Sequence, residues 1–80
     1  MKGKVGVNSP LGILISLSPR ETQILEGVAR GETSKQVAAR LKMSSRTVEV
    51  HLARIRNKLH ARSSSQAVAN ALMGGFLKLY

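Results

Sequence analysis

Residues 47–59, which read TVEVHLARIRNKL, decide the fold of this chain. The apolar residues in this stretch recur every three or four positions, which is the spacing of one face of an α-helix. On a wheel of about 100° per residue, four of them fall together: Val48, Leu52, Ile55 and Leu59. The opposite face carries little acid and several arginines. We therefore expect a helix that is capped by Ser44 and extends to about His60, with one buried face and one exposed face.

Three more helix starts flank this stretch, each marked by a Ser or Thr with a Glu or Gln three residues later. They are Ser18-Pro19-Arg20-Glu21, Thr33-Ser34-Lys35-Gln36 and Ser63-Ser64-Ser65-Gln66. Pro19 suits a first helical position, and Gly31 and the Gly74-Gly75 pair mark helix ends. The sequence shows no internal repeat and no strand-type alternation. It predicts an all-α, four-helix domain over 17–80, preceded by an N-terminal tail or linker over 1–16.

Charge indicates the class of partner. Thirteen Lys and Arg residues against four acidic residues give the chain a net charge of +9, which attracts polyanions such as nucleic acid. The aromatic residues, Phe76 and Tyr80, lie at the C-terminus, so the body of the chain has no platform for stacking unpaired bases. Duplex DNA is therefore favoured over single-stranded nucleic acid.

Several classes of site are not supported by the residues. The chain has no Cys for a disulfide or a thiolate metal site, and no apolar run approaches the roughly 18–20 residues of a membrane span. His51 and His60 have no carboxylate cluster beside them, so neither a metal site nor a catalytic constellation is indicated. We expect a cytoplasmic protein with no enzymatic activity, no cofactor, no metal and no membrane attachment.

The predicted helix 34–41 and the helix after Ser44 together form a helix-turn-helix pattern. A short capped helix, a tight turn and a longer helix with a basic exposed face suit the major groove of DNA. Four residues are predicted to face bases: Arg46, Glu49, Val50 and Ala53. Seven are predicted to contact phosphates: Ser34, Lys35, Thr47, His51, Arg54, Asn57 and Lys58. Glu49 can accept from a cytosine amino group but repels phosphate, so we expect it to shape sequence preference and reduce affinity.

In combination these residues resemble the LuxR/GerE/NarL-type helix-turn-helix regulators, from residue 17 to about 77. The resemblance rests on Leu17-Ser-Pro-Arg-Glu21, Ala29-Arg-Gly31, Gln36-Val-Ala38, Leu41, Met43-Ser44, Thr47-Val48, His51, Ile55, Lys58-Leu59 and Gln66-Ala67. It implies a four-helix domain that binds DNA as a dimer and regulates bacterial-type transcription, with Glu49, Val50 and Ala53 close to bases. It also implies a receiver or ligand-sensing domain upstream in most relatives, although small members with this domain alone exist.

The resemblance further implies that the C-terminal helix supplies the homodimer contact. Three apolar residues are candidates for that interface: Leu72, Met73 and Phe76. Burial in the core of a single chain would explain the same residues, so both interpretations stay open at this point.

Two functions from other classes also stay open. A helix-turn-helix that has lost its DNA readout could dock on RNA polymerase or on another regulator. Alternatively, the basic face and the apolar stretch 11–17 could bind an anionic lipid surface. For Glu21, a role as the capping-box carboxylate alone is favoured over an ion pair with Lys58.

Overall fold

Four helices make up the fold of residues 15–78, the part of the chain that the computed structural model describes. They are α1 (Pro19–Ala29), α2 (Ser34–Leu41), α3 (Ser45–Lys58) and α4 (Ser64–Met73). The prediction of an all-α, four-helix fold is confirmed over these residues. Most of the expected tail over 1–16 lies outside them, whereas Ile15 near its end packs against the core, as does Leu17 at the start of the domain.

The N-terminus of each helix is capped by the hydroxyl residue that the sequence indicated. One side-chain oxygen per helix accepts from the backbone N–H three residues later, at 3.0–3.1 Å: those of Ser18, Thr33, Ser44 and Ser63. The capping box is reciprocal for α1 and α2. It is not reciprocal for α4, where the prediction is wrong. Gln66 Oε1 accepts instead from the N–H of Arg62, at 2.7 Å.

One or two residues beyond the end of each helix lies a residue with a left-handed backbone, and the next N–H makes a hydrogen bond back into the last helical turn. The left-handed residues, with φ between 53° and 92°, are Gly31, Lys42, His60 and Gly75. The following N–H reaches back in each case, as from Ala61 to the carbonyl of Arg56 at 2.8 Å. Because the chain turns at His60 in this way, α3 ends at Lys58 rather than near His60.

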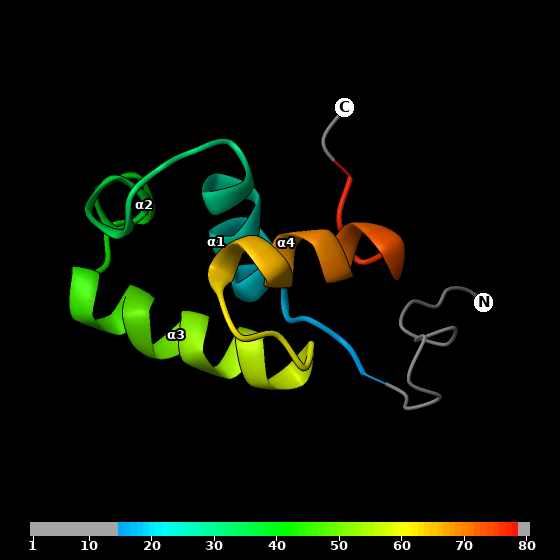
Figure 1. The fold of residues 1–80 in the computed structure, drawn as a ribbon. Helices are drawn as coiled ribbons and strands as arrows, with labels where there is room; N and C mark the ends of the chain where they lie inside the picture. The colour runs from blue at the N-terminus through cyan, green and yellow to red at the C-terminus, as the bar shows by residue number, and fades with distance from the viewer. Residues whose placement is uncertain (1–14, 79–80) are drawn as a thin grey trace.

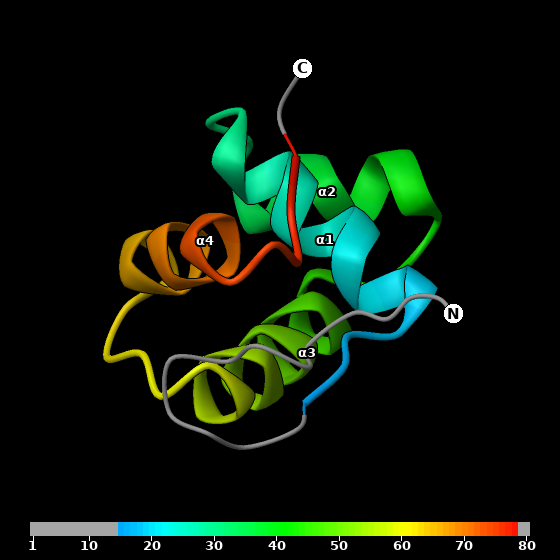
Figure 2. The ribbon, with the colours of Figure 1, turned by 90° about the vertical axis from the view of Figure 1, so that its right-hand side faces the viewer.

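The α1 helix packs against each of the other three helices. Figure 1 shows α3 along the lower edge of the molecule, with α2 at one end and α4 above the other. The turned view in Figure 2 shows α1 and α2 on one side of α3. The buried core consists of Ile24, Leu25, Val37, Ala38, Val48, Leu52, Ile55, Leu59, Ala67, Ala71, Phe76 and Leu77. The four apolar residues predicted on the buried face of α3 all belong to it, which confirms that prediction.

Phe76 belongs to this core, which favours core burial over the dimer contact, the two interpretations that the sequence left open for it. Gly75, with a φ of 80°, turns the chain back after α4, and the N–H of Phe76 donates to the carbonyl of Ala71 at 2.8 Å. The ring then lies so close to Gly74 that a Cβ there would be 2.6 Å from it. Phe76 is 9 % exposed, so it offers little surface to a second chain.

Candidate nucleic-acid interface

The α2–α3 pair forms a helix-turn-helix whose two helices share one core. The turn spans 42–44, and the left-handed φ of 58° at Lys42 reverses the chain. The N–H of Met43 donates to the carbonyl of Ala38 at 2.8 Å, and Ser44 then caps α3. Val37 and Ala38 of α2 are buried in the same cluster as the apolar face of α3. This packing fixes α3 against α2 and leaves the other side of α3 open to solvent.

The open side of α3 carries the residues that the sequence predicts to face bases. All four are exposed: Arg46, Glu49, Val50 and Ala53. Val50 is 45 % exposed and is one of only three large apolar side chains exposed in the described part of the chain. An apolar side chain in that position is suited to contact with the methyl group of thymine.

The residues predicted to contact phosphates also reach the surface. Lys35 lies in the first turn of α2, and the exposed members on α3 are Thr47, Arg54 and Asn57. Ser34, His51 and Lys58 are half-buried. The set therefore spans the beginning of α2 and the length of α3, although three of its members are only partly accessible.

A hydrogen bond joins the first turn of α2 to the exposed side of α3. Ser34 Oγ donates to Glu49 Oε2, across 15 residues of sequence. The two residues border a shallow surface pocket, together with Lys35, Ser45 and Arg46. The cations of Lys35 and Arg46 and the carboxylate of Glu49 therefore lie together near the N-terminal ends of α2 and α3. A helical wheel treats each helix separately, so it could not reveal this contact.

The ammonium group of Lys58 forms an ion pair within the protein. Its Nζ donates to Glu21 Oε1 at 2.7 Å and to the carbonyl of Ser16 at 3.1 Å. The same Glu21 oxygen accepts from the N–H of Ser18 at 2.8 Å. Glu21 thus caps α1 and also pairs with α3, so the prediction that it acts as a cap alone is wrong. A phosphate contact by Lys58 would have to share an ammonium that already has two partners.

The environment of Glu21 favours its charged form. Burial of the carboxyl group favours the neutral acid, but hydrogen bonds from Lys58 and the Ser18 backbone and the positive charge of Lys58 outweigh it. The net effect lowers the pKa of Glu21 below its ordinary value of 4.5. The ion pair between α1 and α3 is therefore present at neutral pH.

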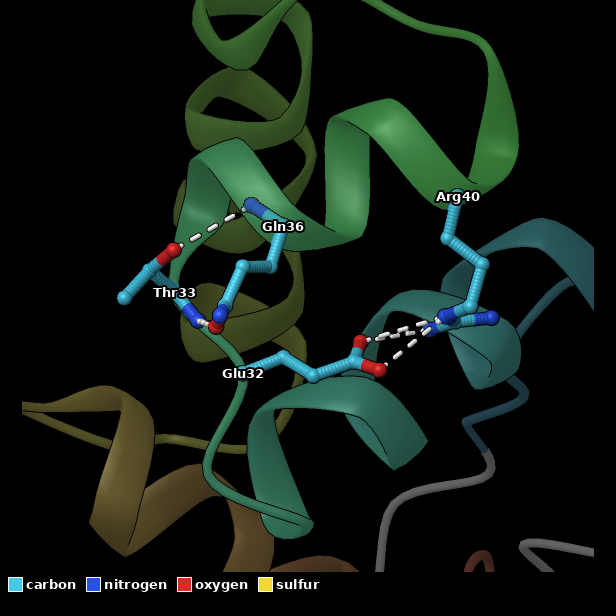
Figure 3. Close-up of polar contacts among 4 residues, drawn as sticks. All are labelled: Glu32, Thr33, Gln36 and Arg40. Carbon is cyan, nitrogen blue, oxygen red and sulfur yellow. Dashed lines mark hydrogen bonds and ion pairs between the residues drawn. The ribbon is translucent and has the colours of Figure 1, made fainter.

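Polar contacts brace the loop between α1 and α2 (Figure 3). Arg40, near the end of α2, donates to Glu32, with 2.8 Å between Nη2 and Oε1. This hydrogen bond lowers the pKa of Glu32 below 4.5. The pair lies over Gly27, where a Cβ would be 2.6 Å from Arg40 Nη2. Together with the Thr33 capping box, these contacts hold the first turn of α2 in place.

Other kinds of site find little support in the structure. Within residues 15–78, no group of three or more His, Cys, Asp or Glu side chains is placed to hold a metal ion. His51 Nδ1 is buried and has no hydrogen-bond partner among those residues. None of the four helices is long and apolar enough to cross a membrane. The apolar stretch 11–17, named above for lipid binding, lies mostly outside the described residues.

Comparison with known proteins places this arrangement in a family. Residues 15–71 match the bacterial regulatory proteins of the luxR family. The transcriptional regulatory protein FixJ of Rhizobium meliloti (strain 1021) is 46 % identical over 63 residues, covering 79 % of this chain and 31 % of FixJ. FixJ of Bradyrhizobium diazoefficiens is 42 % identical over 62 residues, covering 78 % of this chain and 30 % of its own length. The chain therefore spans less than a third of the length of these relatives.

Solved structures agree with the family match. The transcription factor GerE superposes with a TM-score of 0.76 at 33 % identity, covering 80 % of this chain and 96 % of GerE. A Vibrio cholera VqmA–ligand–DNA complex gives a TM-score of 0.72 at 30 % identity, covering 86 % of this chain and 30 % of VqmA. Sequence and fold point to the same group, so this chain belongs to the LuxR family of bacterial regulatory proteins and has its helix-turn-helix fold.

Proposed function

We propose that this chain binds duplex DNA through the exposed side of α3, inserted in the major groove, and regulates transcription. The observation that carries the proposal is the division of α3 into a buried apolar face and an opposite face with four exposed residues. The major groove accepts one α-helix and displays a different pattern of donors and acceptors for each base pair. VqmA, similar in fold, has been solved with DNA, which supports this choice of partner.

Base recognition and affinity would come from different residues. Arg46, Glu49, Val50 and Ala53 would read bases, since they share the exposed side of α3. Lys35 and the exposed flank of α3 would bind phosphates, assisted by the N–H groups of the first turn of α2, which have no partner within the helix. With a net charge of +9, most of the affinity would come from the phosphates.

We infer that two copies of the chain bind together through α4. Leu72 and Met73 are 41 % and 73 % exposed on this helix, and a two-fold contact would bury them against the same residues of a second copy. Such a pair would present two α3 helices to half-sites about 34 Å apart. The regulator would act on DNA in the bacterial cytoplasm. In the alternative function, the helix-turn-helix would dock on RNA polymerase instead of on DNA.

Selection of duplexes from a random pool tests the proposal. The wild-type chain is expected to enrich one family of sequences, and Lys35→Ala is expected to weaken binding to all of them. Loss of one phosphate contact should also flatten the slope of log K against log salt by about 0.9. Val50→Ala should leave that slope unchanged and alter the preferred sequence, because the side chain carries no charge.

Lys78→Ala is the matched control, since it removes the same charge from the segment that follows α4. It should change the affinity less than Lys35→Ala does. If the wild-type chain enriches no sequence and binds duplex DNA no better than heparin, the proposal is refuted. A helix-turn-helix that docks on another protein would then be the better explanation.

A further inference from the structure

We propose that Ser34 is a positioning residue for base recognition, which orients the carboxylate of Glu49 toward the amino group of a cytosine. The inference rests on the proposed binding of DNA by α3 and adds a residue of α2 to the determinants of specificity. It also gives Ser34 a different role from the phosphate contact that the sequence suggested.

Ser34 Oγ donates to Glu49 Oε2, and a serine hydroxyl has only one hydrogen to donate. In this geometry the hydroxyl therefore has no proton left for a phosphate oxygen. Phosphate binding at the start of α2 would pass to the exposed Lys35 and to the backbone N–H groups of the first turn.

The free oxygen of Glu49 limits which base the side chain would accept from. A carboxylate has about four lone-pair sites on two oxygens, so Oε1 stays available when Oε2 accepts from Ser34. Cytosine N4 and adenine N6 are the amino donors that the major groove displays. Adenine presents its N7 acceptor beside that amino group, which would repel a carboxylate, whereas cytosine does not. The arrangement therefore favours cytosine opposite Glu49.

The hydrogen bond from Ser34 also restricts the conformations of the Glu49 side chain. An exposed Glu on a helix samples several rotamers, and ordering it upon binding weakens the preference that it can express. Ser34 presents its hydroxyl from a fixed support, because the Thr33–Gln36 box and the Glu32–Arg40 pair brace α2 (Figure 3). The contact thus orders the carboxylate before DNA arrives.

Two cations lie near the negative charge of Glu49. A lone carboxylate near the DNA backbone is repelled by phosphates. Lys35 and Arg46 border the same surface pocket as Ser34 and Glu49, so two positive charges offset that repulsion locally. Glu49 can then contribute to the choice of base with a smaller loss of affinity.

Selection from a random duplex pool with the full chain tests the proposal, using the wild type, Ser34→Ala, Ser34→Thr, Ser45→Ala and Glu49→Ala. The position that Glu49 reads is identified as the one whose preference disappears in Glu49→Ala. There Ser34→Ala is expected to lower the preference for cytosine about 3- to 10-fold, the net effect of one ordinary hydrogen bond at a solvent-exposed site. Ser34→Thr keeps a hydroxyl and should retain the preference.

Ser45→Ala is the matched control, because it removes a hydroxyl from the border of the same pocket where no bond to Glu49 is made. It should leave the preference for cytosine unchanged. In the Glu49→Ala background, Ser34→Ala should have no further effect at that position, as expected for a pair that acts as a unit. Circular dichroism verifies that each variant keeps its helix content.

Three outcomes would overturn the proposal. If Ser34→Ala weakens binding to all sequences equally and leaves the position read by Glu49 unchanged, Ser34 is a phosphate contact and DNA reading by α3 stands. A preference for a base other than cytosine at that position would also refute it. If the wild-type chain enriches no sequence, the proposed function and this inference both fail.

Discussion

Replacing Glu21 separates two contributions that one carboxylate makes to stability. Glu21→Ala removes both the acceptor for the N–H of Ser18 and the partner of Lys58. Glu21→Gln keeps an acceptor oxygen of the same reach and removes only the charge. The difference between the two variants therefore measures the cap, and the effect of Glu21→Gln measures the ion pair.

The expected magnitudes follow from the geometry. Loss of a capping interaction costs about 1 kcal/mol. The ion pair lies between an exposed and a buried one, because the side chain of Lys58 is 39 % exposed and that of Glu21 7 %. We assign it about 1 kcal/mol, near the upper limit for exposed pairs. Glu21→Ala should then lower the free energy of unfolding by about 2 kcal/mol and Glu21→Gln by about 1 kcal/mol, which lowers Tm by roughly 8–16 °C and 4–8 °C.

The pH dependence of these penalties has a definite sign. The pKa of Glu21 is lowered in the folded chain, so the stabilisation by its charge is present above the unfolded pKa of about 4.5. It is lost as the pH falls through the folded pKa, which lies below 4.5. The penalty of Glu21→Gln should therefore be complete at pH 7 and shrink in acid. In acid, Glu21→Ala should keep the part of its penalty that comes from loss of the cap.

Urea denaturation followed by circular dichroism at several pH values measures these effects. Glu26→Gln is the matched control, because it removes the same charge from the same helix outside the Lys58 pair. A cycle with Lys58→Met should return a coupling free energy of about 1 kcal/mol between the two residues. If Glu21→Gln is as stable as the wild type at pH 7, or if its penalty is unchanged in acid, the reasoning is refuted.

Two other predictions concern the C-terminal part of the chain. Gly74→Ala should lower the free energy of unfolding by about 1–3 kcal/mol in the same denaturation assay, because its Cβ would be 2.6 Å from the ring of Phe76. Unchanged stability would mean that the ring moves aside at no cost. Leu72→Asp and Met73→Asp should convert a homodimer to monomers in sedimentation velocity while circular dichroism shows that the chain stays folded, since both side chains are exposed. A dimer that persists in both variants would exclude this part of α4 as the contact.

Local chemistry made the helix starts predictable. A capping hydroxyl bonds to the backbone N–H three residues later. The caps made by Ser18, Thr33 and Ser44 can therefore be predicted from a few consecutive residues. The helix ends were only half predictable. Glycine indicates a left-handed residue, whereas Lys42 and His60 adopt the same conformation despite their side chains. The conformation of those two turns depends on how the following helix packs, and no local sequence pattern predicts that packing.

Contacts between helices limited the prediction of the candidate site. The period of α3 correctly assigned its buried and exposed faces, because one helix is enough to define them. The Glu21–Lys58 pair joins residues 37 positions apart, and it depends on where α1 crosses α3. The Ser34–Glu49 bond depends in the same way on the angle between α2 and α3. Sequence supplied the chemical groups at these points, and the packing of the helices decided which of them meet.

The separation of the two faces of α3 also affects how such a domain can evolve. Residues that stabilise the fold and residues that face outward occupy different positions, so Arg46, Val50 and Ala53 can change with little effect on folding. New binding preferences are thus accessible by single substitutions from a stable parent. Glu49 is the exception, because its carboxylate accepts a hydrogen bond from Ser34. A library that aims to redirect this domain should therefore vary 34 and 49 as a pair and the other positions independently.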